Sequence, residues 1–157
     1  GYLYGVFPPG RQDAKAAGRV LANLVRGHAA AYQAIKEVQP VARVGIAQHF
    51  RGFRPGRSWS PFDRWAAGLL HKYLNDAFPR ALQDGILRLP FGSQKIPEAK
   101  GTQDYLGLNY YTEELAAFSP TRANEFFTRR YYQPGIETSE GDFISNVPEV
   151  IFREIEW

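Results

Sequence analysis

Residues 101–112 constrain the fold more than any other part of the chain. Within this run, the mostly apolar residues 105–108 are followed by an amide and two polar aromatics, Asn109, Tyr110 and Tyr111. A short apolar run of this kind is typical of a parallel strand that is covered on both faces. In an α/β barrel, the residues at the C-terminal end of such a strand point into the active site.

The order of the predicted elements extends this interpretation to most of the chain. Apolar residues recur at three- and four-residue steps over 13–38, which predicts an amphipathic helix that ends before Pro40. Residues 44–48 read as a short strand, and 105–111 as the next one. Strands separated by long helices need crossover connections, so we expect these two to be neighbours in a parallel sheet.

Capping signals place a second helix between the two predicted strands. Ser60 suits the N-cap, Pro61 the first helical position and Asp63 the positive first turn, and the apolar pattern stops near Gly85. Whether one helix or two fill this span stays open. The remaining segments are predicted as a loop (51–59), a connector interrupted by Pro and Gly (87–100), a long excursion (120–141) and a last helix (149–157).

Composition excludes several classes of protein. The 157 residues are 44% hydrophobic and 15% aromatic, which argues for a globular chain. A net charge of +3 with scattered cations does not indicate a nucleic-acid partner. Without Cys there is no disulfide or thiol chemistry, which is compatible with a cytoplasmic location. No apolar run reaches the ~20 residues of a membrane span.

Several motifs resemble glycoside hydrolase family 1, the β-glucosidase and β-galactosidase barrel enzymes. Residues 104–111, Asp-Tyr-Leu-Gly-Leu-Asn-Tyr-Tyr, resemble the sixth-strand motif of that family, with Tyr105 in place of Phe. The segments 1–10, 23–32, 44–46 and 75–90 resemble, in order, the loop after the fourth strand, the following helix, the fifth strand and an Asn-x-x-Phe…Asp-Gly…Pro run. The resemblance covers nearly the whole chain.

This resemblance implies an α/β fold, as a partial TIM (β/α)8 barrel from the loop after the fourth strand through the helix after the sixth. Residues 1–157 would be an internal segment of a single barrel domain, since a full barrel needs ~250 residues. The family hydrolyses β-glycosides with retention and without a cofactor. Its two catalytic Glu lie in Asn-Glu-Pro and Glu-Asn-Gly motifs, which this sequence lacks. We therefore expect the chain alone to be inactive and its partners to be the remaining barrel segments and a β-glycoside substrate.

The resemblance also assigns site residues. Tyr111 matches the Tyr whose hydroxyl supports the nucleophilic carboxylate, and Asn109 lies two residues earlier on the same strand face. His49 and Gln48 stand where the family places an aglycone-side polar residue, commonly Asn, so they are the predicted substrate-binding pair. Because His departs from that pattern, the leaving-group preference stays open.

Other polar residues have simpler interpretations. Four candidate carboxylates lack a strand-end context and are expected to be solvated: Glu113, Glu114, Glu125 and Glu140. His28 is expected to be a packing residue. Three His without metal-ligand spacing do not indicate a metal site. A non-catalytic carbohydrate-binding or scaffold protein is the alternative that the aromatic content leaves open.

Overall fold

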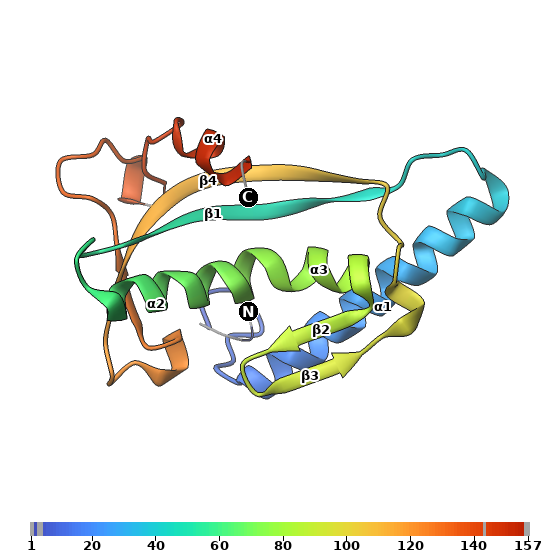
Figure 1. The fold of residues 1–157 in the computed structure, drawn as a ribbon, viewed down its shortest axis with the longest axis horizontal. Coiled ribbons are helices and arrows are strands. Elements are labelled where there is room, and N and C mark those ends of the chain that lie inside the picture. The colour runs from blue at the N-terminus through green and yellow to red at the C-terminus, as the bar shows by residue number, and fades with distance from the viewer. Residues whose placement is uncertain (1, 3–4, 143, 156–157) are drawn as a thin grey trace. The chain divides into compact units, whose positions relative to one another are not determined.

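The computed structural model describes residues 2, 5–142 and 144–155 (Figure 1). They form two compact units, Gly1–Gln48 with Asp76–Gly107, and His49–Asn75 with Leu108–Trp157. In the described part of the chain, no helix has the length and apolar character that a membrane crossing requires.

Helix α1 (Ala14–Val38) dominates the first unit. Its N-cap is Asp13, whose carboxylate accepts a hydrogen bond of 2.9 Å from the Ala16 amide. At the other end the Gln39 amide still bonds the Ile35 carbonyl oxygen, and Pro40 cannot extend the ladder. The helix predicted over 13–38 is therefore confirmed.

The core of the first unit lies between α1, helix α3 (Ala77–Asp84) and a small hairpin. The hairpin pairs β2 (Ile86–Leu89) with β3 (Gly92–Lys95) in antiparallel register, and a 3-10 turn, Pro97–Ala99, follows. The connector predicted over 87–100 is therefore more regular than its Pro and Gly residues indicated. Its Pro and Gly are turn residues, because Leu89 pairs with Gly92 across a two-residue turn and Gly92 has φ +134°.

His28 packs within this unit, as the sequence predicted. Its ring lies edge-on to Phe78, and Nε2 donates a 2.6 Å hydrogen bond to the Thr102 carbonyl oxygen. The half-buried imidazole is thus a satisfied structural residue.

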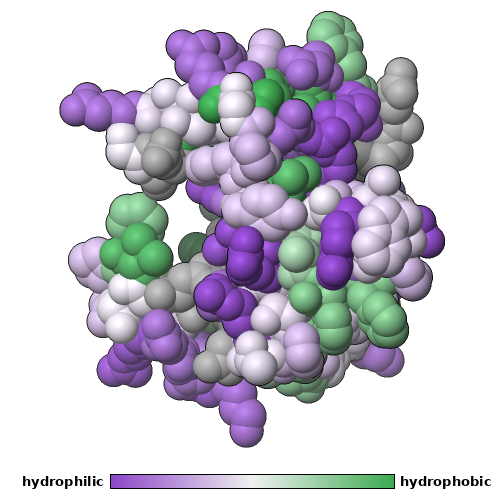
Figure 2. Space-filling model, turned by 90° about the vertical axis from the view of Figure 1, so that its left-hand side faces the viewer, coloured by the Kyte–Doolittle hydropathy of each residue, from purple (hydrophilic) through white to green (hydrophobic). Residues whose placement is uncertain are grey.

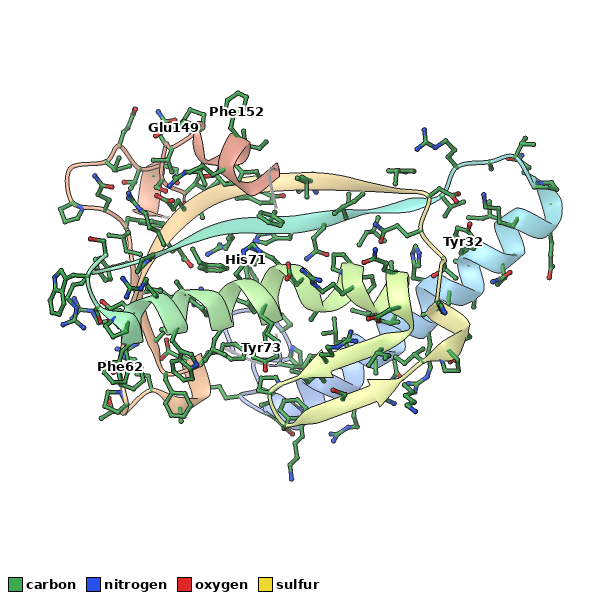
Figure 3. All side chains as sticks on the ribbon, viewed as in Figure 1. Tyr32, Phe62, His71, Tyr73, Glu149 and Phe152 are labelled. Atoms are coloured by element: carbon green, nitrogen blue, oxygen red, sulfur yellow. The ribbon has the colours of Figure 1, made fainter. Side chains whose placement is uncertain are left out.

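Asp104 ties the end of α1 to the entry of the sheet. Its carboxylate accepts from Lys36 Nζ at 2.7 Å, from the Tyr32 hydroxyl at 2.9 Å and from the Val44 amide at 2.9 Å. Figure 3 labels Tyr32 near the C-terminal end of α1. The Lys36 hydrogen bond is the main reason why the pKa of Asp104 is lowered to about 2, with the Val44 amide next.

This pKa predicts how stability changes in acid. A carboxyl whose folded pKa is below its unfolded value of about 3.9 stabilises the fold above that pH and loses its contribution as the pH falls toward 2. Asp104→Asn should therefore flatten the loss of stability between about pH 4 and pH 2. Urea-unfolding midpoints over this range would measure it, and parallel curves for the two proteins would contradict it.

Strands β1 (Gly45–Pro55) and β4 (Tyr105–Phe118) are hydrogen-bonded neighbours in a three-stranded sheet of order β1-β4-β5. Close approaches join them in rising order of residue number: Gly45 with Tyr105, Gly107 with Ile46, Gly52 with Glu113 and, through a 2.9 Å hydrogen bond, Gly56 with Ala116. The two strands are therefore parallel (Figure 1), as predicted for 44–48 and 105–110.

Both strands are longer than the sequence indicated. The loop expected from residue 51 is still strand as far as Pro55, and β4 continues to Phe118. Within the predicted excursion, β5 (Thr128–Tyr131) folds back antiparallel to β4. The Ser119 amide donates to the Phe127 carbonyl oxygen at 2.7 Å and closes the turn between the two strands. Because β5 is antiparallel and β1 is parallel to β4, the sheet is mixed.

The second helical span begins as its caps predict. The Ser60 hydroxyl accepts from the Asp63 amide at 3.2 Å, and Pro61 opens helix α2 (Pro61–Leu70). A π-helical stretch, His71–Asp76, then continues into α3, which ends at Gly85 with φ +76°. The open question of one helix or two is thus answered by one continuous helical run with a π-helical interior.

The second unit has a smaller core. Ala67 and Leu70 of α2 pack with Ala116 of β4 and with three half-buried residues, Phe53, Leu74 and Phe126. The C-terminal helix α4 covers Val150–Ile155. Of the helix predicted over 149–157, Glu149 lies in a turn, and residues 156–157 are outside the described part of the chain.

Asp63 is the most buried ionised group of this unit, with no exposed surface. Its carboxylate accepts from Arg57 Nε at 2.8 Å, from a terminal guanidinium nitrogen at 2.9 Å and from the Arg57 amide at 3.0 Å. The Phe118 amide adds a fourth hydrogen bond of 3.0 Å. One carboxylate thus joins the start of α2 to the loop before it and to the end of β4.

Candidate functional site

Tyr111 and Asn109 lie on the same face of β4 and are both exposed, Tyr111 by 39%. Tyr110, between them, is half-buried and donates its hydroxyl to the Val147 carbonyl oxygen at 3.0 Å. This alternation is the one that a strand requires. The side chains predicted to do chemistry therefore share the accessible face, and Tyr110 serves packing.

His49 on β1 lies against Tyr111 on β4. The two rings are stacked, with centroids 4.6 Å apart and planes tilted by 21°. Figure 1 shows the two strands that carry them running side by side. The structure thus brings together two residues that the sequence separates by a continuous helical run and a hairpin.

Gln48 is half-buried, whereas His49 is exposed. Successive side chains of a strand point to opposite faces. Gln48 is therefore directed away from the face that carries His49, and its predicted role toward a substrate stays a prediction.

Arg51 is a member of this cluster that sequence reasoning missed. Its Nε donates to His49 Nε2 at 3.1 Å, and a terminal nitrogen donates to Glu114 at 2.7 Å. Arg130 of β5 donates to the other Glu114 oxygen at 3.0 Å. Three strands therefore contribute to one polar network beside Tyr111.

The expectation that Glu113 and Glu114 are solvated was wrong. They are only 7% and 8% exposed, and each carboxylate lies between two guanidinium groups. Glu113 pairs with Arg54 at 3.2 Å and with Arg153 of α4 at 2.8 Å. Burial of a carboxylate needs such partners, and they come from elements far apart in the sequence.

The remaining candidate carboxylates agree better with the sequence. Glu140 is exposed, and Glu125 is half-buried beside Arg122 at 3.0 Å. Among the residues that the structure describes, no group of three or more His, Cys, Asp or Glu side chains is placed to hold a metal ion.

The electrostatics of the cluster favour a neutral His49. The side chain of His49 is exposed as a whole, but its ring is partly desolvated where it stacks on Tyr111. This partial desolvation is the largest cause of the lowered pKa of the imidazole, and the Arg51 charge is the second. The Glu114 carboxylate acts in the opposite direction but does not cancel them. At neutral pH the ring is therefore uncharged.

A pocket of about 400 Å³ adjoins Tyr111. Tyr110 and Tyr111 form one wall, and residues 137–139 and 144–148 form the others. The buried hydroxyls of Thr112 and Ser145 are 2.6 Å apart. Their hydrogen bond joins the segment 144–148 to β4. Small-molecule sites have volumes of this order.

The chain is similar in sequence to known proteins. The family model described as "Glycosyl hydrolase family 1" matches residues 1–140. Beta-glucosidase A of Thermotoga maritima is 32% identical over 132 residues, which are 76% of this chain and 29% of that protein. A beta-galactosidase of Pyrococcus woesei is 30% identical over 133 residues, 75% of this chain and 26% of that protein.

Solved structures are similar over almost the whole chain. A beta-glycosidase from Pyrococcus horikoshii has a TM-score of 0.85 at 26% identity and covers 99% of this chain, which spans 35% of that structure. The family 1 β-glucosidase from Thermotoga maritima has a TM-score of 0.80, also at 26% identity. The match covers 99% of this chain and 37% of that structure. This chain thus spans about a third of its relatives, and the fold is consistent with a segment of their barrel. The chain belongs to glycosyl hydrolase family 1.

Proposed function

We propose that the chain is the sector of a retaining β-glycosidase, of β-glucosidase type, that runs from the loop after the fourth barrel strand through the helix after the sixth. One observation carries the proposal. Tyr111 and Asn109 are exposed together on β4, and His49 of the parallel neighbour β1 stacks on Tyr111. The resemblance to family 1 assigns these residues to the active site. They lie midway along β4 and β1 rather than at the strand ends, and they are exposed.

In this role the Tyr111 hydroxyl donates a hydrogen bond to the nucleophilic carboxylate. The hydrogen bond stabilises the charged form of that Glu and lowers its pKa, so the nucleophile stays ionised. Asn109 organises polar groups beside it. A second carboxyl group protonates the leaving oxygen, a covalent glycosyl-enzyme forms, and water hydrolyses it.

His49 is the proposed contact on the leaving-group side, with Gln48 beside it in the chain. A flat ring offers a hydrophobic face as well as polar nitrogens, which suits sugar or aryl leaving groups. The substrate class is a β-linked glucoside or galactoside. Cytoplasmic location stays a prediction.

The remaining barrel segments are the proposed partners of the exposed apolar residues. Figure 2 shows hydrophobic residues interspersed with hydrophilic ones on the surface that it draws. Several large apolar side chains are more than half exposed: Val6, Phe7, Leu24, Val38, Val41, Trp59, Phe62, Phe91 and Phe152. In the proposed barrel, the remaining segments would cover part of these side chains.

The test compares the chain with the full-length protein. We expect the full-length protein to hydrolyse an aryl β-glucoside and the 157-residue chain to show no turnover, since the general acid and the nucleophile supply most of the rate. Turnover by the chain that survives mutation of Tyr111 and Asn109 would overturn the proposal. So would a full-length protein that binds glucosides without hydrolysing them, which would favour a carbohydrate-binding module.

A further inference from the structure

We propose that Arg51 is a positioning residue, which holds the His49 ring flat against Tyr111 as the neutral tautomer protonated on Nδ1. The inference rests on the proposed function, because that function makes His49 and Tyr111 the substrate-facing pair.

The chemistry of the hydrogen bond determines the tautomer. Arg51 Nε lies 3.1 Å from His49 Nε2, and a guanidinium nitrogen in a protein is always a protonated donor. The imidazole nitrogen that receives this bond must therefore carry a lone pair. A neutral imidazole with Nε2 as acceptor has its proton on Nδ1.

Arg51 is itself held on both sides. Its side chain is 19% exposed, the guanidinium donates to Glu114 at 2.7 Å, and Arg130 donates to the second Glu114 oxygen. The Asn75 side chain, which is 2% exposed, donates to the Arg51 carbonyl oxygen at 2.8 Å. Charge-assisted hydrogen bonds of this kind fix geometry as well as charge. The donor that faces His49 is thus preorganised from three strands and the π-helical stretch.

The same arrangement disfavours a second cation beside Tyr111. Protonation of Nε2 would place two donors opposite each other and bring a charged ring next to the Arg51 guanidinium. The charged groups of this network are Arg51 on β1, Glu114 on β4 and Arg130 on β5. The direction of the His49 pKa shift agrees, since burial and Arg51 outweigh Glu114.

Nitrogen NMR tests the inference without any substrate. Full-length protein labelled with ¹⁵N-histidine, and assigned with His49→Asn, should show His49 with an unprotonated Nε2 and a protonated Nδ1 at neutral pH. Arg51→Gln should mix the two tautomers and shift the titration of His49 to higher pH. Arg54→Gln is the matched control, since Arg54 is also on β1 but pairs with Glu113, and it should leave the His49 signals unchanged.

Two outcomes would overturn the inference. One is a wild-type spectrum with a proton on Nε2, which needs no variant and so does not depend on whether Arg51→Gln folds. The other is an Arg51→Gln variant that retains the fold and shows the same Nδ1-protonated state and the same His49 titration as the wild type, because then the Arg51 donor would not be what selects the tautomer. Correct tautomers together with full activity of Tyr111→Phe would refute the proposed function and leave the inference intact.

Discussion

Replacing Tyr111 by Phe in the full-length protein should lower kcat for an aryl β-glucoside about 10²–10³-fold, the size of loss that removal of one preorganised active-site donor causes, because the hydroxyl orients the nucleophilic carboxylate and keeps it ionised. Phe keeps the ring that stacks on His49 at 4.6 Å and removes only the hydroxyl. The nucleophile would lose a hydrogen bond to its charged form, so its pKa should rise. The acid limb of the pH profile of kcat/KM should therefore move to higher pH.

Tyr110→Phe is the matched control on the neighbouring position. Its hydroxyl bonds the Val147 carbonyl oxygen, so this variant should lose about 1 kcal/mol of stability and keep its activity. Steady-state kinetics and thermal unfolding of both variants separate the two effects. Equal activity in Tyr111→Phe and wild type would show that the exposed hydroxyl has no catalytic role.

The fold was predictable where local signals are strong. Asp13 and Ser60 both act as caps, and Gly85 ends α3 in the left-handed conformation. The hairpin β2–β3 was missed because Pro90 and Gly92 suit a tight turn as well as an irregular loop. Strand β5 was missed because four residues with mixed polarity carry no clear period, and only pairing with β4 makes them a strand.

The site was predictable in part for a similar reason. Tyr111, Asn109 and His49 stand at strand positions that the sequence marks, and the parallel register brings β1 beside β4. The ion pairs of Glu114 were missed because a carboxylate in a sequence is expected to be solvated unless its cationic partners are known. Arg51 was missed for the same reason, since its partner is Glu114. Those cations come from β1 and β5, so only the tertiary arrangement reveals the network.

Replacing Asp63 by Asn should destabilise the fold by about 3 kcal/mol, at the lower end of the range for removing one member of a buried ion pair. Asp63 is fully buried and accepts four hydrogen bonds, and an amide would turn a donor toward the donors of Arg57 and Phe118. The loss should lie at the lower end because the Arg57 side chain is half exposed and can be rehydrated.

The pH dependence of this loss tests its cause. Hydrogen bonds from Arg57 hold the pKa of Asp63 well below its usual range, so the carboxylate contributes fully above about pH 4 and loses its contribution as the pH falls. The difference in urea-unfolding midpoint between wild type and Asp63→Asn should therefore be largest at neutral pH and shrink in acid. Glu98→Gln, which removes a charge from a half-exposed pair with Arg26, is the control and should change little at any pH. A constant difference across pH would assign the loss to shape and hydrogen-bond geometry rather than to the buried charge.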